Sequence, residues 1–423
     1  MSSSCPSRTR RATRTTTVVG GTGVLAIGLV SVASGQELYF IPRVEVTTEY
    51  NTNRELTPDK ALQDEMIHYR GLFEAQMGRR TPRSDVEFRP RVVLQEFPDR
   101  EGIDPVELFF DLDTGFHTQR SEFLLFARYS RQDSFNAEYG NANFDPFEPQ
   151  DPNADDTGIT YIGDTRKRIT VEPDYSFAVS ERTRIGANAR YDNVNYDAND
   201  DKPPGTVGLI GYDSGRVQVY LQRSFGPQFD LQVGPYVSRY EADDNSNQTD
   251  NYGLAFDGKY TWSQIWETGL TFQVERSDTT QTQAIPPALE ETTTNWGLEF
   301  YGLRKGEVTS LRYSVGHFIE PSSVASMIET NQLRVQYDHI FTPRLTFNGS
   351  LRVKESARLG SSSASSSDFA RAELSLRWRM TLSWFVRGGY RYAWSDPAGP
   401  GDNASDNALF ITIGYLGLDP RRR

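Results

Sequence analysis

The chain has little of the chemistry that holds covalently cross-linked or metal-stabilised folds together. Its 423 residues include one cysteine, Cys5, and four histidines. Cys5 lies in an N-terminal segment that we expect to be removed, so we expect no disulfide, iron–sulfur cluster or cysteine-bound zinc in the mature chain. The sequence therefore predicts no cofactor and no metal site.

Long hydrophobic runs are also missing. Beyond the first forty residues no apolar stretch of about 18 residues occurs. Hydrophobic residues make up 37% of the chain, and the mean hydropathy is -0.59. These values argue against a helical membrane protein, yet aromatic residues reach 12%, which is much for so polar a chain.

Residues 1–35 have the parts of a secretory signal peptide. An apolar stretch (18–32) precedes small residues (33–35) that suit cleavage. The basic residues before it are Arg8, Arg10, Arg11 and Arg14. A membrane anchor is the alternative, but the stretch is short and rich in glycine. We therefore expect residues 1–35 to be a signal peptide and 36–423 to form a single domain.

Charge balance limits the class of partner. The full chain has 57 acidic and 45 basic residues and a net charge of -12. Loss of the predicted signal would make it more acidic, because that segment holds arginines and no acid. An acidic exported chain argues against a nucleic-acid partner.

Strict alternation of apolar and polar residues is the dominant pattern. Residues 344–354 read RLTFNGSLRVK, with Leu345, Phe347, Leu351 and Val353 on one face and polar residues on the other. The same pattern recurs at 185–192, 270–275, 333–338 and 370–379. Alternation over eight to ten residues is typical of a strand with one apolar face.

Connections alternate in length. Short ones fall at 79–84, 118–121, 180–183, 226–228, 304–308 and 341–345. Long ones, rich in Asp, Asn, Pro, Gly and Ser, fall at 134–163, 192–205, 241–251, 277–293 and 356–367. Tight periplasmic turns alternating with longer extracellular loops are typical of outer-membrane barrels. Asn348-Gly349 resembles a hairpin turn, but turning there would leave arms too short to cross a bilayer.

The sequence thus predicts an all-β fold: a transmembrane, antiparallel, up-and-down β-barrel of about 18 strands, with 16 as the alternative. Soluble sandwiches also alternate, but their strands are shorter. Aromatic residues near strand ends suit the two headgroup levels of a bilayer. One group lies beside short turns: Trp262, Trp266, Phe341, Trp378 and Trp384. The other lies beside long loops: Tyr50, Tyr69, Tyr240, Tyr252, Trp296, Tyr392 and Trp394.

With its signal peptide, strand units of roughly twenty residues and opening strand IPRVEVTTEYNTN, the chain resembles the putative β-barrel porin type 2 proteins. The resemblance implies a bacterial outer-membrane location and an association with exopolysaccharide or exosortase systems. One departure is the end, LFITIGYLGLDPRRR, since many outer-membrane proteins end on an aromatic residue used in assembly.

An enzymatic function has weaker support in the sequence than a pore. A hydrolase would need a histidine beside a serine or carboxylate at the outer rim. His317, with Ser314 and Glu320 nearby in sequence, and His68 are the candidates; His117 and His339 lie beside short turns. Acidic stretches at 151–156 and 241–250 lack the full spacing of a calcium loop. We expect no enzyme and no calcium site.

The candidate functional residues are those that alternation points into the lumen. The C-terminal strands contribute Arg334, Arg352, Lys354, Arg371, Arg377, Arg379, Arg387 and Arg391. The N-terminal half contributes acids, among them Glu45, Glu74, Asp111 and Asp113, along with its own arginines. Two interpretations stay open: a basic side facing an acidic side, or charges that pair to stabilise the barrel.

The function we expect is passive, porin-like passage of small or charged solutes, with loop 134–163 controlling access. The alternatives are an accessory barrel in exopolysaccharide secretion and, third, an outer-membrane hydrolase. Expected partners are outer-membrane lipid, lipopolysaccharide, the barrel-assembly machinery and exopolysaccharide system components. Both termini are expected on the periplasmic side.

Overall fold

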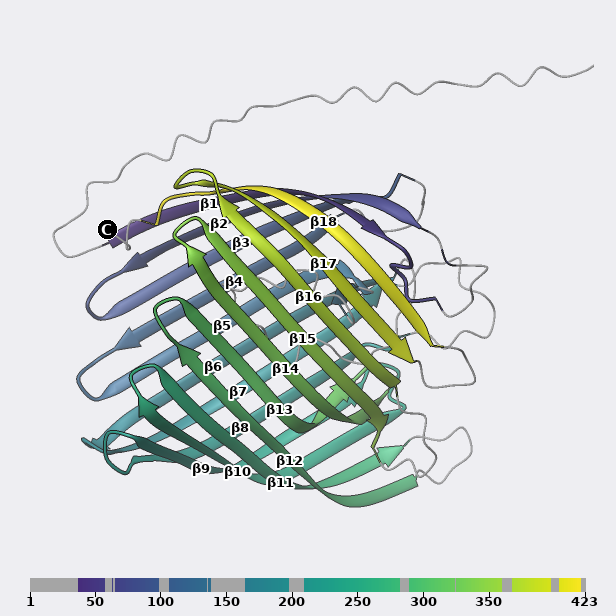
Figure 1. The fold of residues 1–423 in the computed structure, drawn as a ribbon. Coiled ribbons are helices and arrows are strands. Elements are labelled where there is room, and N and C mark those ends of the chain that lie inside the picture. The colour runs from purple at the N-terminus through teal and green to yellow at the C-terminus, as the bar shows by residue number, and fades with distance from the viewer. Residues whose placement is uncertain are drawn as a thin grey trace, which may run out of the picture.

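Eighteen β-strands make up nearly all of the described chain (Figure 1). The computed structural model describes residues 37–57, 63, 65–98, 106–134, 136–137, 164–197, 209–281, 289–323, 325–359, 367–396 and 403–419. The strands are β1 (Glu37–Asn51), β2 (Met66–Arg80), β3 (Ser84–Glu96), β4 (Val106–His117), β5 (Ser121–Asp133), β6 (Thr165–Ser180), β7 (Thr183–Asp197), β8 (Tyr212–Ser224), β9 (Phe229–Ala242), β10 (Asn247–Ser263), β11 (Trp266–Gln281), β12 (Leu289–Lys305), β13 (Thr309–Ser322), β14 (Ser326–Thr342), β15 (Leu345–Arg358), β16 (Ser367–Arg379), β17 (Trp384–Asp396) and β18 (Ala404–Leu416). Within this part of the chain no helix is long and apolar enough to cross a membrane. The predicted signal peptide, 1–35, lies outside the described residues.

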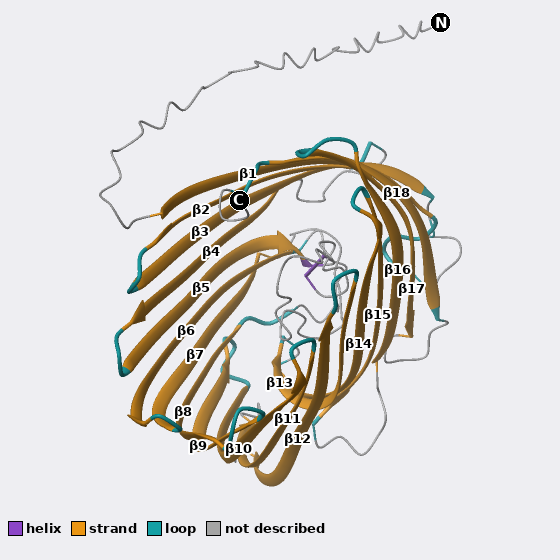
Figure 2. Cartoon of the chain, turned by 60° about the vertical axis from the view of Figure 1, so that its left-hand side comes forward, coloured by secondary structure: helices purple, strands orange, loops and turns teal. Residues whose placement is uncertain are grey.

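Each strand pairs antiparallel with its neighbours in sequence, and the last strand returns to the first. β1 pairs with β18 from Arg43↔Leu416 to Asn51↔Ala408, which closes the sheet into a barrel (Figure 2). We call this β1–β18 pairing the seam. The prediction of an all-β, up-and-down antiparallel barrel of 18 strands is confirmed, and the alternative of 16 strands is wrong.

Connection lengths differ between the two ends of the barrel. At the end where β1 begins and β18 finishes, which we call the short-turn end, no connection exceeds four residues (Figure 1). The opposite, long-connection end carries most of the predicted long loops. The prediction of a long loop at 241–251 is wrong, because β9 runs to Ala242 and β10 starts at Asn247, which leaves a four-residue turn.

The stretch RLTFNGSLRVK lies in one continuous strand, β15, as alternation predicts. Gly349 pairs with Tyr337 on one side and Leu374 on the other. Asn348 lies on the opposite face, where its Nδ2 donates to Asp338 Oδ1 at 2.6 Å. The Asn-Gly pair therefore makes no turn, because both neighbouring strands hold it in register.

Apolar side chains are exposed on the outside of the barrel over a band of defined height. In β10, Tyr252 and Trp262 are 55% and 60% exposed and lie ten residues apart; β17 has Trp384 and Trp394 at the same spacing. Ten residues rise roughly 33 Å along a strand. At a tilt of about 45° they span about 23 Å across the bilayer, close to the roughly 25 Å band of membrane barrels.

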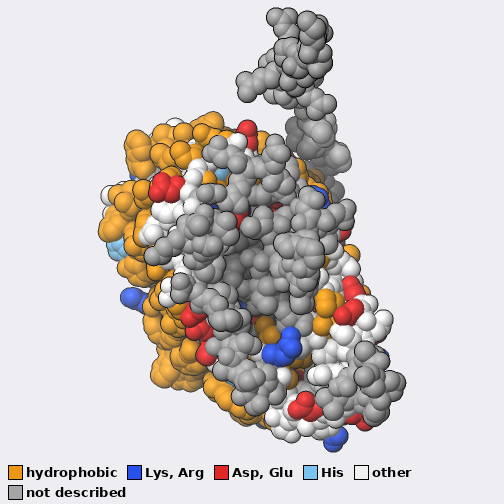
Figure 3. Space-filling model, turned by 90° about the vertical axis from the view of Figure 1, so that its right-hand side faces the viewer, with side chains coloured by type: hydrophobic (Ala, Val, Ile, Leu, Met, Phe, Trp, Pro, Cys, Tyr) orange, Lys and Arg blue, Asp and Glu red, His pale blue; other side chains and the backbone are white. Residues whose placement is uncertain are grey.

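Seen from the long-connection end, hydrophobic side chains gather along the outside of the wall (Figure 3). Beyond Tyr252, strand β10 continues to Asn247 with polar residues on its outer face. There Asp250 Oδ1 accepts from Arg239 Nε at 2.7 Å. The change from aromatic to charged residues marks where the wall leaves the apolar layer.

Candidate functional site

The strand register places every predicted lumen residue on the face opposite the exposed apolar side chains. Directly paired residues of antiparallel strands point to the same side, so one outward residue fixes the face of a whole row. The residues on the inner face include Glu45, Glu74, Asp111, Asp113, Arg334, Arg352, Lys354, Arg371, Arg377, Arg379, Arg387 and Arg391. Whether these side chains govern permeation is argued under Proposed function.

Like charges stand directly opposite one another on β14, β15 and β16. Arg334 pairs in register with Arg352, and Arg352 pairs with Arg371. Arg377 of β16 and Arg387 of β17 form a second such pair. Like charges in direct opposition destabilise a sheet. On β16, Arg371 also binds Glu373 of the same strand at 3.3 Å.

The inner face of β13–β17, which we call the basic wall, carries a large excess of positive charge. Its basic residues are Arg312, Arg334, Arg352, Lys354, Arg358, Arg371, Arg377, Arg379, Arg387 and Arg391. Its acidic residues are Glu320, Asp338 and Glu373. The sequence prediction of an arginine-rich side is consistent with this placement.

The inner face of β3–β7, which we call the compensated wall, pairs its charges internally. Arg128 Nε lies 2.6 Å from Asp111 Oδ1. Asp192 accepts from Arg168 at 2.8 Å and from Arg190 at 2.6 Å. The predicted acids do lie here, but arginines of the same wall neutralise many of them. Of the two open interpretations, internal pairing describes this side of the lumen.

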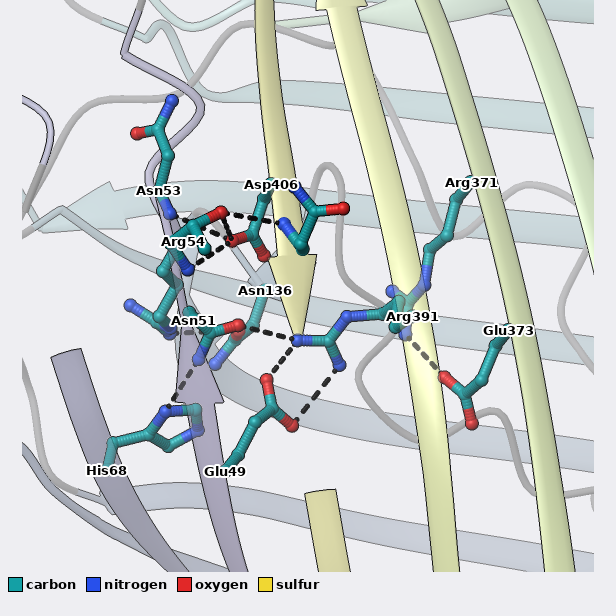
Figure 4. A network of polar contacts seen from close by, with 12 residues as sticks. Glu49, Asn51, Asn53, Arg54, His68, Asn136, Arg371, Glu373, Arg391 and Asp406 are labelled. Atoms are coloured by element: carbon teal, nitrogen blue, oxygen red, sulfur yellow. Dashed lines mark hydrogen bonds and ion pairs between the residues drawn. The ribbon is translucent and has the colours of Figure 1, made fainter. Parts of the chain in front are cut away.

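Side chains cross the seam to join β17 to β1 (Figure 4). Arg391 of β17 binds Glu49 of β1 through both of its terminal nitrogens, passing over β18. Arg387 also reaches over β18, and its Nη2 lies 3.8 Å from Glu45 Oε2. The residue that pairs with Arg391 on β18 is Ala408, whose small side chain leaves room for the crossing. The basic wall is therefore tied to β1 at one edge.

A polar network continues from the seam toward the long-connection end (Figure 4). Asn51 Nδ2 lies 3.1 Å from His68 Nδ1. Arg54 donates to Asn136 Oδ1 at 3.2 Å, and Asn136 Nδ2 donates to Glu107 Oε1 at 2.6 Å. Asn136 belongs to the predicted access loop 134–163, of which only residues 134, 136 and 137 are described.

The tip between β13 and β14, of which residues 322, 323 and 325–327 are described, reaches across the inside of the barrel to β7–β10. Tyr240 Oη donates to the Ser322 carbonyl at 2.8 Å, and the Ile210 amide donates to the Ser323 carbonyl at 2.9 Å. Tyr196 Oη and Ser323 Oγ lie 2.7 Å apart. Ser322 and Ser323 are fully buried. We call these residues the inward tip; it narrows the lumen against β7–β10.

Sequence reasoning missed the inward tip. Its residues, SSVASM, look like an ordinary polar turn. Two features hold it in place: Ala325 adopts a left-handed φ of 55°, and Met327 packs among Val194, Tyr212 and Tyr240. The Met327 contacts are made with strands more than eighty residues earlier, so no local signal could have revealed them.

The histidines do not assemble the predicted hydrolase alternative. His317 faces outward, 2.9 Å from Asn331 and with its ring 4.6 Å from that of Trp296. Ser314 and Glu320 lie on the inner face of the same strand, so the grouping with His317 is wrong.

The other three histidines lie in separate places. His68 is buried and stacks on Phe97 at 5.2 Å. His117 lies near the short-turn end between Asp85 and Glu122, at 3.2 and 3.3 Å. His339 is paired with Thr309 at 3.1 Å beside a short turn. Each therefore has its own local partners.

Of the two acidic stretches considered for calcium, only 241–250 lies within the described residues. Residues 151–156 lie outside the described chain. Within 241–250, Asp250 is engaged by Arg239, and Asp244 Oδ1 accepts from the Ser246 amide at 2.9 Å in the turn. The second stretch is thus a tight hairpin whose acids serve local contacts.

Comparison with known proteins finds no matching family model and no matching curated protein. The resemblance to porin type 2 proteins therefore stays a prediction. Among solved structures, OccAB3 of Acinetobacter baumannii is 10% identical, with a TM-score of 0.41 covering 89% of this chain and 99% of that one. OccK2 (OpdF) of Pseudomonas aeruginosa, solved in complex with glucuronate, is 11% identical, with a TM-score of 0.43 covering 90% and 99%. The ferric-catecholate import receptor Fiu of E. coli is 9% identical, with a TM-score of 0.39 covering 88% and 81%.

Proposed function

We propose that this protein is a passive pore of the bacterial outer membrane, with a lumen that favours small anions. The observation that carries the proposal is the division of the barrel surface. Apolar and aromatic side chains are exposed on the outside, and charged side chains line the inside. A barrel of this kind is stable in lipid and holds water in its lumen.

The basic wall supplies the selectivity in this proposal. The row Arg334–Arg352–Arg371 places three guanidinium groups side by side in one strand register. An anion that enters a narrow, low-dielectric pore is stabilised by such a row, while a cation is repelled. Because the compensated wall largely neutralises itself, the basic wall is the main source of positive charge in the lumen in this proposal.

Passage is restricted at the inward tip. Ser322 and Ser323 of the tip lie inside the barrel near the long-connection end and are fixed by hydrogen bonds to Tyr196, Ile210 and Tyr240. A solute must pass beside this constriction and along the basic wall. The mechanism is restricted diffusion, with no energy input and no covalent step.

In this proposal the barrel also has a defined orientation in the outer membrane. The strand ends at Glu37 and Leu416 lie at the short-turn end, which in this proposal faces the periplasm. The long-connection end then faces the lipopolysaccharide leaflet, and insertion requires the barrel-assembly machinery. Protease added to intact cells should cut only connections at the long-connection end; cleavage confined to 118–120 or 343–344 would reverse the orientation.

Planar-bilayer recording of the purified barrel tests the proposal. We expect an ohmic conductance whose reversal potential in a salt gradient indicates anion preference. An absence of conductance would overturn the pore. It would favour the alternative of an accessory barrel in exopolysaccharide export, which the docked inward tip also suits.

A further inference from the structure

A cavity of about 280 Å³ lies between the inner face of β7–β12 and the strand ends that carry the inward tip. Its floor is formed by polar and charged side chains of β8–β12, including Arg216, Glu275 and Glu299. Its other side, from β13 and β14, carries the apolar residues Phe318 and Met327 together with Glu320. Its volume is near the lower end of the range for small-molecule sites, roughly 300–1,000 Å³.

One tyrosine holds a cation and an anion next to each other on the cavity floor. The Arg216 guanidinium lies over the Tyr236 ring, 3.8 Å from its centre. Tyr236 Oη donates to Glu275 Oε2 at 2.7 Å. Gln273 Oε1 accepts from Arg216 Nη1 at 3.2 Å, which fixes the guanidinium further. Both charges are thus positioned by neutral groups.

A glycine makes this arrangement possible. Gly253 lies on β10, between Tyr236 and Glu275 in the strand register. A Cβ at this position would be 2.6 Å from Tyr236 Cζ. The missing side chain lets the phenol cross β10 and reach the carboxylate on β11.

The three charged groups on this floor are held mainly by neutral side chains. Arg216 contacts Tyr236 and Gln273, Glu275 accepts from Tyr236, and Glu299 is hydrogen-bonded to Ser314 with Arg334 nearby. By contrast, Asp192 at the edge of the same cavity is shared by Arg168 and Arg190. The Arg216 guanidinium and the carboxylates of Glu275 and Glu299 therefore line one small space, together with Glu320 from β13.

We propose that this cavity binds a small zwitterion, an α-amino acid with an apolar side chain. Its carboxylate would bind the Arg216 guanidinium, its ammonium group would lie at Glu275 and Glu299, and its side chain would pack against Phe318 and Met327. Charge-assisted hydrogen bonds at both ends favour a ligand that carries both charges over one that carries either. The inference rests on the proposed pore, since the ligand reaches the cavity through the lumen.

Calorimetric titration of the detergent-solubilised barrel with three matched probes tests this site. The probes are L-phenylalanine, N-acetyl-L-phenylalanine and L-phenylalaninamide, which offer both charges, the carboxylate alone and the ammonium alone. We expect the free amino acid to bind at least about tenfold more tightly than either blocked form. Equal binding of the N-acetyl form would overturn the zwitterion site in favour of an anion site.

Two variants test which residue binds the carboxylate of the ligand and which binds its ammonium group. Arg216→Gln should weaken binding of the amino acid and the N-acetyl form, and Glu275→Gln should weaken binding of the amino acid and the amide, each by about tenfold. Arg276→Gln, on the outer face of β11, is the control and should leave binding unchanged. Circular dichroism and heat-modifiable gel migration check that each variant is folded. Loss of affinity for all three probes in both variants would overturn the assignment of ends.

Conductance measured on the same preparation separates this inference from the proposed function. Amino-acid binding by a barrel that does not conduct would overturn the pore and support the site. A conducting barrel that binds none of the three probes would support the pore and overturn the site.

Discussion

The two sides of the lumen treat charge differently. On the compensated wall, Asp111 and Asp192 are engaged by arginines within 3 Å. On the basic wall, Arg334, Arg352 and Arg371 stand opposite one another in register. Both walls have the same strand geometry and the same alternation. The difference teaches that charge in a barrel lumen can serve stability on one side while a field is maintained on the other.

The largest expected effect comes from removing an acid that neutralises arginines on the compensated wall. Asp192→Asn removes the carboxylate shared by Arg168 and Arg190 and leaves the buried Arg168 guanidinium without it, while Arg190 keeps its contact with Glu172 at 2.8 Å. Removing one partner of a buried ion pair costs about 3–5 kcal/mol. Urea unfolding in lipid vesicles measures this loss.

The matched control for Asp192 is Asp113→Asn. Asp113 lies on the same wall, opposite Glu87 in register, and forms no ion pair with a described residue. We expect its free energy of unfolding to change by less than about 0.5 kcal/mol. Equal losses in the two variants would remove the distinction between shared and isolated acids.

The next effect compares the outer and inner faces of the basic wall. Leu351 is 39% exposed on the outside of β15, and Arg352 lies beside it on the inside. Leu351→Arg should cost about 2–4 kcal/mol of membrane folding energy, because a charge near mid-bilayer is expensive. Arg352→Leu should cost clearly less in the same refolding titration, and the reverse order would contradict the strand register.

Selectivity should change when the basic wall is neutralised. Replacing Arg352, Arg371 and Arg377 with Gln should shift the reversal potential toward cation preference. The shift should shrink in high salt, because the Debye length falls from about 10 Å at 0.1 M to about 3 Å at 1 M. Arg239→Gln, on the outer face, is the control and should leave the reversal potential unchanged. An unmoved reversal potential in the triple variant, with lower stability, would make the basic wall structural.

The smallest expected effect concerns the inward tip, which rests on the compensated wall's last strand and its neighbours. Tyr196→Phe removes the contact with Ser323 and should loosen the tip by about 1 kcal/mol. Single-channel conductance or its open-state noise should rise. Tyr191→Phe is the control, since its hydroxyl donates to Asp213 on the outside. A matching change in both variants would show that the tip does not limit conductance.

Alternation along the sequence predicted the faces of the strands well. In RLTFNGSLRVK the period of two places Leu351 outside and Arg352 inside without any knowledge of neighbours. It failed at 241–251 for a physical reason. Above the aromatic level both faces of a strand meet water or other polar groups, so Asp, Asn and Ser are tolerated in a strand and resemble a loop.

The pairing of charges could not be read from the sequence. Arg334, Arg352 and Arg371 become neighbours only through the register of three strands, which depends on turn lengths and bulges. The same holds for Arg216, Tyr236 and Glu275, whose contact also needs Gly253 between them. Sequence alone gave the residue types on the inner face but left open which of them meet.

The seam has a consequence for the kinetics of assembly. All other strand pairings join neighbours in sequence. At the seam, by contrast, the hydroxyls of Thr47 and Thr412 lie 2.8 Å apart although the two residues are separated by 365 positions. Closing so long a loop adds only about 3 kcal/mol to the entropy cost of a short hairpin. Closure of the seam is therefore delayed by the order in which the strands become available, and not mainly by its free-energy cost. Hairpins can form early, but β1 and β18 meet only after the whole chain is present. A nascent barrel that stalls before this step would expose two strand edges to lipid, where unsatisfied backbone groups are most costly.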